Sequence, residues 1–178
     1  MKSGEVKMLN RQEIQRLIKE KKLIADYPNL DTQLAPNGFD LTVGSVFEFT
    51  SSGALDFSNK ERLIPQTKEI IPQKKNPQDK FGWWNLKGGA YKIRTNESIH
   101  LSTDLVGIAF PRSSLLRVGA FTQTGVWDAG FKGKSEFILV VENIHGLRLK
   151  QNARIIQIVF IRINETNLGY QGIYQMKP

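Results

Sequence analysis

The chain of 178 residues contains no cysteine and only two histidines. Without cysteine it forms no disulfide, has no thiol nucleophile and cannot build a thiolate zinc site. His100 and His145 each stand alone, without the spaced partners that a histidine-built metal site or a Ser-His-Asp triad needs. The sequence therefore disfavours thiol-dependent, zinc-dependent and triad chemistry.

Long apolar runs and glycine-rich phosphate loops are also missing. No stretch approaches the ~20 apolar residues of a membrane span, and the first fifteen residues, MKSGEVKMLNRQEIQ, lack the apolar core of a secretory signal. Neither a Walker-type loop nor a dinucleotide fingerprint is present. With 40% hydrophobic residues, the chain is expected to form one cytoplasmic domain, residues 1–178, without membrane association.

Acidic residues are in the minority, with 17 Asp and Glu against 25 Lys and Arg and a net charge of +8. This balance favours an anionic partner such as a nucleotide, a nucleic acid or an acidic surface. The basic residues are dispersed, however, as in an ordinary solvated surface. Only DKFGWWNLKGG, with Trp83 and Trp84, interleaves cations with aromatic residues as nucleic-acid surfaces do. No specific nucleic-acid partner is expected.

One amphipathic helix is predicted, near the N-terminus. The segment LNRQEIQRLIKEKKLI, within residues 8–24, places Ile14, Leu17 and Ile18 on one face. Asn10 and Glu13 have the spacing of a capping box at its start. Beyond this segment the helical signal nearly vanishes.

The rest of the chain has the pattern of a β domain. FDLTVGSVFEF alternates like a strand, residues 50–80 form a polar tract with prolines, and residues 168–178 are predicted to form a mobile tail. From residue 90 onward, short strand-like segments are separated by Gly, Asn and Asp. They are AYKIRT, ESIHL, LVGIAF, AFTQTG, SEFILVVEN, GLRLK and ARIIQIVFIRI. The pattern predicts a mostly β sandwich or barrel with one N-terminal helix.

Two short segments carry groups that a core strand does not need. In PRSS, the guanidinium of Arg112 suits phosphate, and Ser113 and Ser114 add hydroxyl and backbone N–H donors. In GVWDAGF, Asp128 lies among small residues, where a carboxylate can orient or deprotonate a water molecule. From the residues alone, an ordinary structural ion pair between Arg112 and Asp128 is the alternative.

These segments resemble the motifs of the dUTPase and dCTP deaminase superfamily. PRSSLLRVG is similar to its phosphate-binding motif, GVWDAGFKG to its aspartate motif, NGFDLTVG to its first motif and ARIIQIVF to its fourth. The N-terminal helix and GYQG in the tail resemble the deaminase-like branch. The motifs follow in the family's order over most of the chain, except residues 50–80. The resemblance implies a distorted β-barrel or jelly-roll-like fold and a homotrimer whose active sites lie between subunits.

The resemblance also bears on the reaction. Deaminases of this superfamily carry a glutamate ten residues after the aspartate; here that position is Ile138, or Val140 when the count is anchored on Asn143. An aliphatic residue cannot shuttle protons, and Glu136 and Glu142 match neither count. We therefore favour hydrolysis of dUTP to dUMP and pyrophosphate, a step of nucleotide metabolism. The alternatives are dCTP deamination, with or without dUMP formation, and a non-catalytic protein that binds nucleotides or nucleic acid.

For dUTP hydrolysis the resemblance implies a role for each motif residue. Asp128 would activate the water that attacks the α-phosphate, with Mg²⁺ bridging the phosphates. Phe131 would pack beneath the deoxyribose and leave no room for a 2′-hydroxyl. Asp40 would support Arg112 or act on the metal through its water shell. The phosphates would be held by Arg112, Ser113, Ser114 and Gln157, and the base by Thr122, Gln123 and Tyr170, the last when the tail closes.

Overall fold

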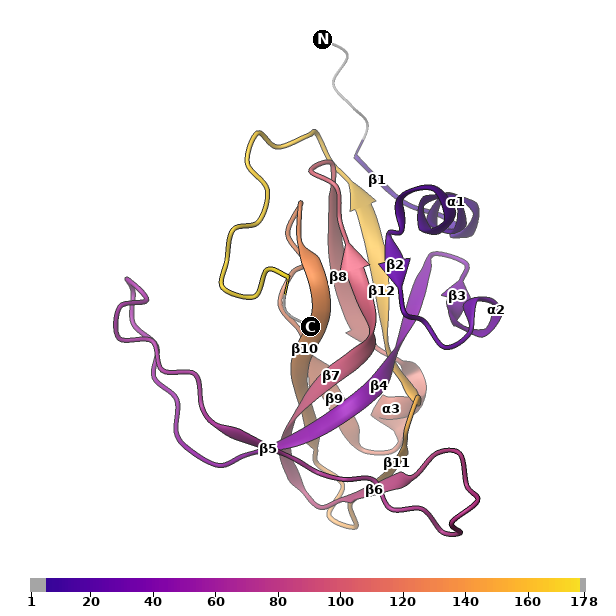
Figure 1. The fold of residues 1–178 in the computed structure, drawn as a ribbon, viewed down its shortest axis with the longest axis vertical. Helices are drawn as coiled ribbons and strands as arrows, with labels where there is room; N and C mark the ends of the chain where they lie inside the picture. Colours follow the sequence, from indigo (N-terminus) through magenta and orange to yellow (C-terminus); the bar gives the residue numbers. More distant parts are fainter. Residues whose placement is uncertain (1–5, 177–178) are drawn as a thin grey trace.

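The computed structural model of the chain describes residues 6–176. Its strands form one curled ten-stranded sheet and a separate two-stranded sheet, with α1 packed at one side (Figure 1). The elements are β1 (Lys7–Met8), α1 (Arg11–Lys21), β2 (Ile24–Ala25), α2 (Leu30–Gln33), β3 (Leu34–Ala35), β4 (Gly38–Phe49), β5 (Thr67–Glu69), β6 (Trp83–Leu86), β7 (Gly89–His100), β8 (Leu105–Pro111), α3 (Ser113–Arg117), β9 (Ala120–Gln123), β10 (Lys132–Val141), β11 (Leu147–Lys150) and β12 (Arg154–Arg162). The predicted mostly β class is confirmed. None of the helices in the described range has the length and apolar character of a membrane span.

The order of strands in the main sheet brings the sequence motifs to defined places. The sheet runs β1-β12-β4-β7-β10-β9, with β8 paired to β12, β2 to β7, and β3 and β5 to β4. The main ladders are antiparallel. The segment PRSS follows β8, while GVWDAGF connects β9 with β10. The two segments with functional groups are therefore attached to different parts of the sheet.

Helix α1 begins as the sequence predicts. The side chain of Asn10 accepts from the Glu13 backbone N–H at 3.0 Å, and the Glu13 carboxylate accepts from the Asn10 N–H at 3.1 Å. This is the predicted capping box, and the three predicted apolar residues of its inner face are buried. The helix itself is shorter than residues 8–24, because Lys22 adopts a left-handed conformation (φ 53°) that ends it.

Residues 50–80 form two excursions from the sheet. An arm between β4 and β5 is closed by a bridge between Ala54 and Leu63 and extends away from the body, at the left of Figure 1. A second loop between β5 and β6 is closed by pairing of Gln73 with Trp83. The tract therefore has some β structure of its own, although most of it lies outside the core.

The two adjacent tryptophans do not form an open aromatic surface. Trp84 is 2% exposed, and its indole N–H donates to the Ile70 carbonyl at 2.6 Å. The ring of Trp83 faces two cations of the same chain, Arg148 at 4.9 Å and Lys150 at 5.2 Å. Trp84 therefore belongs to the core, and the side chains of Arg148 and Lys150 pack over the ring of Trp83.

A fully buried carboxyl group lies under the sheet at Glu97. It accepts hydrogen bonds from the side chain of Gln33 at 2.7 Å and from the hydroxyl and backbone N–H of Thr42 at 2.6 and 3.0 Å. Gln33 also donates to the backbone carbonyl of Asp40. Burial raises the pKa of Glu97 above its ordinary value, and the bonds from Thr42 and Gln33 oppose that rise.

The raised pKa of Glu97 predicts a pH-dependent effect of Glu97→Gln. A carboxyl whose pKa is raised by folding stabilises the fold most below its ordinary value of 4.5, and that contribution is lost as the pH rises. Glutamine does not titrate, and its NH2 group cannot accept from the Thr42 N–H, a loss of about 1–3 kcal/mol. The melting temperature of the variant should therefore lie below that of the original chain, by a margin that narrows from pH 4.5 toward neutral pH. Calorimetry across this range, with exposed Glu69→Gln as the control, checks the trend; a margin that widens with pH would contradict it.

Candidate functional site

The first cluster, which we call the Arg112 corner, consists of Asp40, Arg112, Arg154 and Gln157. Adjacent strands bring it together, because Gln157 of β12 lies opposite Asp40 of β4 on one side and opposite Phe110 of β8 on the other. Arg112 directly follows β8, and its backbone N–H donates to the Ile155 carbonyl at 2.9 Å. Three antiparallel strands thus fix the corner.

Asp40 is the centre of the Arg112 corner. Its carboxylate accepts from Arg112 Nε at 3.0 Å, from Arg154 Nη1 at 3.1 Å and from Gln157 Nε2 at 3.4 Å, while its side chain is only 6% exposed. Burial raises the pKa of Asp40, and the two guanidinium groups beside it oppose the shift. Arg112 keeps 31% exposure. The corner therefore holds one guanidinium rigidly from within and presents its outer side to solvent.

Ser113 and Ser114 begin the short helix α3 beside this guanidinium, and both are exposed. Arg112 is the N-cap residue of α3, and its carbonyl accepts from the Leu115 N–H at 2.9 Å. The structure therefore groups four of the predicted phosphate ligands: Arg112, Ser113, Ser114 and Gln157. Arg154 completes the corner, and no role for it was predicted. It lies at the start of β12, in the motif ARIIQIVF, which was the available signal.

The second cluster is the aspartate turn, residues 124–131, between β9 and β10. Asp128 is exposed, and its carbonyl accepts from the Phe131 N–H at 3.0 Å. The preceding Trp127 exchanges two backbone hydrogen bonds of 2.9 Å with Gly107 of β8, and its indole donates to Ser135 at 2.7 Å. A Cβ on Gly107 would come within 2.9 Å of the Ile158 side chain and 3.2 Å of Trp127, so a larger residue there would displace Ile158. The turn is therefore anchored while its carboxylate faces solvent.

The two clusters lie at opposite ends of β8. The aspartate turn pairs with Gly107, and Arg112 follows five residues later along the same strand. At about 3.4 Å per residue this separation is ~17 Å. Arg112 forms its ion pair with Asp40 rather than with Asp128. The alternative of a structural Arg112–Asp128 pair is therefore wrong within one chain, and one chain does not bring the two groups together.

Phe131 borders a cavity of about 460 Å³, which we call the Phe131 cavity. The aspartate turn forms one wall through Gly125 and Trp127, and the base of the arm forms another through Phe49 and Ile64. Its volume lies in the range of small-molecule sites, about 300–1,000 Å³. The predicted deoxyribose-packing residue therefore lies at a space large enough for a nucleoside.

The predicted base-binding residues of β9 lie on opposite faces of that strand. Thr122 is 6% exposed, and its hydroxyl has no hydrogen-bond partner among the described residues. Gln123 is exposed, and its amide donates to the Thr124 carbonyl at 3.3 Å. Ile138, at the deaminase glutamate position, lies directly opposite Gln123 in β10. Val140, the other position that the resemblance implies for the deaminase glutamate, lies opposite Phe121.

The tail packs against the aspartate turn. The Tyr170 N–H donates to the Ala129 carbonyl at 2.8 Å, and its ring contacts the Phe131 ring edge-to-face at 5.6 Å between centroids. Gly130 has a φ of 82°, and a Cβ there would lie 2.9 Å from the Cα of Gly169. The GYQG segment thus fits closely on the turn. Mobility of the tail stays a prediction, and residues 177 and 178 of the predicted tail lie outside the described residues.

Comparison with known proteins identifies the family of the chain and its fold. Residues 8–163 match the sequence profile described as dCTP deaminase-like. The chain is 43% identical to the probable deoxyuridine 5′-triphosphate nucleotidohydrolase of Archaeoglobus fulgidus, over 94% of this chain and 95% of that protein. It is 35% identical to the deoxyuridine 5′-triphosphate nucleotidohydrolase of Methanocaldococcus jannaschii, over 84% of this chain and 92% of that protein. The crystal structure of 2′-deoxycytidine 5′-triphosphate deaminase from Agrobacterium tumefaciens has a TM-score of 0.64 at 20% identity, covering 88% of this chain and 48% of that one. This last likeness shows the fold.

Proposed function

The chain belongs to the dCTP deaminase-like family, and from this premise we propose that it is an enzyme that hydrolyses dUTP to dUMP and pyrophosphate. The observation that carries the proposal is the pair of positions Asp128 and Ile138. Asp128 presents an exposed carboxylate that can activate a water molecule, and Ile138, where the resemblance implies a deaminase's proton carrier, is aliphatic. Near-full-length similarity to proteins named deoxyuridine triphosphate nucleotidohydrolase supports the same choice. The cytoplasmic location stays a prediction.

In the proposed reaction the Arg112 corner binds the triphosphate. Asp40 holds the Arg112 guanidinium through Nε and the Arg154 carbonyl accepts from its Nη1, so the donors that remain meet the phosphates in a fixed orientation. A preset donor loses little side-chain entropy when the ligand binds. Ser113 and Ser114 add exposed hydroxyl groups at the start of α3.

Asp128 acts as the general base in this proposal. Its carboxylate accepts a proton from a water molecule, which attacks the α-phosphorus in line with the departing pyrophosphate. Phe131, held under the Tyr170 ring, packs against the deoxyribose in the Phe131 cavity. The exposed amide of Gln123 is the proposed base-binding group; the predicted contact of Thr122 would require the buried face of β9 to open.

The chain's donor set limits the role of the predicted Mg²⁺. Among residues 6–176, no group of three or more His, Asp and Glu side chains is placed to hold a metal ion. The Asp40 carboxylate is engaged by two guanidinium groups, so a protein-built site does not fit. Mg²⁺ commonly binds through substrate phosphates and keeps several waters. We propose that the ion arrives with the triphosphate and that Asp40 serves the Arg112 corner.

The ~17 Å of backbone between Arg112 and Gly107, which pairs with the aspartate turn, favours a site shared between subunits. The attacked phosphorus must contact a water held by Asp128 while its phosphates contact Arg112. Because β8 separates these groups within one chain, we propose that Asp128 of one subunit meets Arg112 of another. This arrangement agrees with the homotrimer that the sequence resemblance implies.

The second candidate, dCTP deamination, has less support. The carboxylate nearest to the expected position, Glu136, is held by Arg94 at 2.9 Å and by Lys92 at 3.3 Å. Both ion pairs engage this carboxylate, so it is not free to exchange a proton with a base. Deamination would therefore need a proton carrier other than Ile138 or Glu136.

A product assay tests the proposed function. The purified chain is incubated separately with dUTP and dCTP, with Mg²⁺ or with EDTA, and the monophosphate, pyrophosphate, inorganic phosphate and ammonia are resolved. We expect dUMP and pyrophosphate from dUTP, and loss of turnover in EDTA. Ammonia from dCTP, or inorganic phosphate as the direct product of dUTP, would overturn the proposal.

Phe131→Ala should weaken the discrimination between dUTP and UTP. Removing the ring opens space for a 2′-hydroxyl, so the ratio of kcat/KM for the two substrates should fall by roughly 10-fold or more. Phe57→Ala, at a fully exposed phenylalanine of the arm, is the matched control. Steady-state kinetics on both substrates gives the ratio. Equal rates on dUTP and UTP in the unaltered chain would remove this role from Phe131.

A further inference from the structure

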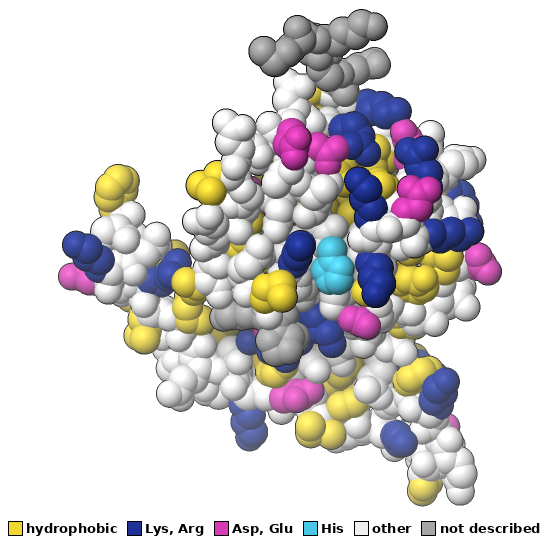
Figure 2. Space-filling view, turned by 45° about the horizontal axis from the view of Figure 1, so that its top comes forward, with side chains coloured by type: hydrophobic (Ala, Val, Ile, Leu, Met, Phe, Trp, Pro, Cys, Tyr) yellow, Lys and Arg dark blue, Asp and Glu magenta, His cyan; other side chains and the backbone are white. Residues whose placement is uncertain are grey.

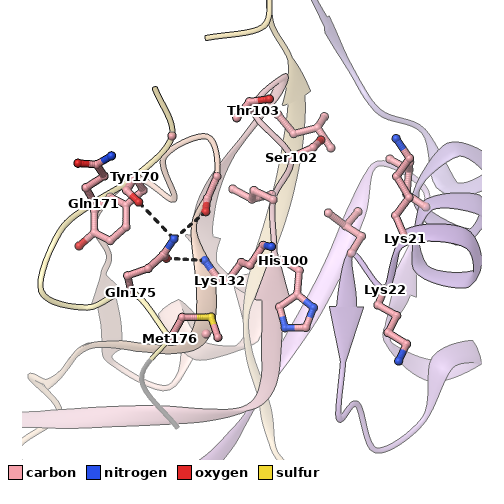
Figure 3. Close-up of a pocket in the computed structure, with 17 residues that line it drawn as sticks. Lys21, Lys22, His100, Ser102, Thr103, Lys132, Tyr170, Gln171, Gln175 and Met176 are labelled. Carbon is pink, nitrogen blue, oxygen red and sulfur yellow. Dashed lines mark hydrogen bonds between the residues drawn. The ribbon is translucent and has the colours of Figure 1, made fainter. Parts of the chain in front are cut away.

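A second and larger cavity, of about 1030 Å³, lies on another side of the aspartate turn (Figure 3). It is bounded by the C-terminal end of α1, the end of β7, the start of β10 and the returning tail. We call it the lysine cavity. The proposed reaction uses none of its basic residues; Tyr170 lines both cavities, and Phe131 does not line this one.

The lining of the lysine cavity is basic. Lys21, Lys22, Lys132 and His100 line it, and its described lining residues include no Asp or Glu. None of the three lysines forms an ion pair with a carboxylate within residues 6–176. Figure 2 shows Lys and Arg side chains around a histidine on one face of the molecule. An uncompensated set of cations around a hollow favours an anion.

The dipole of α1 explains only two of these four basic residues. Lys21 and Lys22 stand at the C-terminal end of α1, where cations offset the helix dipole without any ligand. Lys132 and His100 belong to strands, and the antiparallel ladder places them directly opposite each other. No helix end accounts for these two residues. Basic side chains from α1 and from the sheet therefore border the same space from two sides (Figure 3).

We propose that the lysine cavity binds a polyphosphate anion, either inorganic pyrophosphate or the phosphate chain of a second nucleotide, at a site separate from the catalytic one. A lysine ammonium binds phosphate as a point charge. Because the lysines come from opposite walls, a chain of phosphoryl groups spans them better than a single phosphate. This second site goes beyond the proposed function. Only the idea that its pyrophosphate is the chain's own product rests on the proposed hydrolysis of dUTP.

A ligand in this cavity would also hold the tail. The Gln175 side chain accepts from the Lys132 N–H at 2.8 Å and donates to the Gly130 carbonyl at 3.0 Å (Figure 3). The Met176 N–H donates to the Lys132 carbonyl at 2.7 Å. An anion bound to the Lys132 side chain therefore stabilises the segment to which these hydrogen bonds attach the tail. Hydrogen exchange at Tyr170 and Met176 should slow when it binds.

Calorimetric titration tests the proposal. Pyrophosphate, and separately ATP, is titrated into the full chain with and without a saturating non-hydrolysable dUTP analogue. We expect binding that persists with the analogue present and that weakens about 10-fold or more in Lys21→Gln/Lys22→Gln and in Lys132→Gln. The matched control is Lys74→Gln/Lys75→Gln, an exposed lysine pair in the loop before β6. The stronger of the two titrants identifies the source of the polyphosphate.

The outcomes separate this proposal from the catalytic one. Arg112→Ala should spare binding in the lysine cavity, even if the chain proves not to hydrolyse dUTP. Absence of binding by both titrants, or equal losses in the Lys21/Lys22 and Lys74/Lys75 variants, would overturn the site. Binding without slower exchange at Tyr170 and Met176 would overturn its action on the tail.

Discussion

Asp128→Asn should lower the turnover of dUTP by about 10²–10⁴-fold, the usual contribution of a general base. Asparagine keeps the size and hydrogen-bonding capacity of the side chain but cannot take a proton from water at neutral pH. The affinity for a non-hydrolysable dUTP analogue should change little, because the Arg112 corner still holds the phosphates. Asp128 is exposed, so the melting temperature should also stay close to that of the unaltered chain.

Single-turnover kinetics, analogue binding and melting temperature on the same preparations check this expectation. Asp79→Asn, in the loop between β5 and β6, makes the same chemical change away from both clusters and serves as the control. A folded Asp128→Asn protein that binds the analogue and hydrolyses dUTP at the original rate would end the proposed mechanism.

Arg112→Ala should act on binding first. It removes charge-assisted hydrogen bonds to phosphate, each worth about 1.5–3 kcal/mol, so analogue affinity should fall by about 10–100-fold or more. The change also leaves the buried Asp40 with one guanidinium in place of two, which destabilises the fold. Loss of stability and loss of phosphate binding must therefore be separated.

Arg154→Ala provides that separation. Arg154 holds the same Asp40 oxygen at 3.1 Å, against 3.0 Å for Arg112. Both variants should lower the melting temperature, while Arg112→Ala alone should weaken analogue binding strongly. Equal losses of affinity in the two variants would show that Arg112 acts only through the integrity of the corner.

Local patterns predicted much of this fold because local contacts decide it. The capping box of Asn10 and Glu13 and the strand FDLTVGSVFEF depend on neighbouring residues, and both are found in the structure. By contrast, AYKIRT and ESIHL form one continuous strand, β7. The polar residues Thr95, Asn96 and Glu97 resemble a turn in sequence, but their side chains bond partners on β4, α2, β10 and the loop before β12. Those partners are distant in sequence.

The candidate site shows the same limit. The PRSS and aspartate segments were recognisable because their functional groups are adjacent in sequence. The ion pairs of Asp40 with Arg112 and Arg154 depend on the order β8-β12-β4, which no local pattern reveals. The packing of the tail depends on the close approach of Gly130 and Gly169. The tail has no helical or strand periodicity in its sequence and was therefore predicted to be mobile. In the structure, residues of the tail pack against the aspartate turn.

The length of β8 has a genetic consequence. In a shared site, a subunit with Asp128→Asn still contributes an intact Arg112, and a subunit with Arg112→Ala still contributes an intact Asp128. When the two inactive proteins are unfolded, mixed and reassembled, some of their joint sites would contain both intact groups. Recovery of activity in the mixture would be complementation between two defects in one gene product. If each site lay within one subunit, the mixture would stay inactive. The seven-residue length of β8, which separates Arg112 from the aspartate turn, therefore determines whether two inactive variants can complement each other.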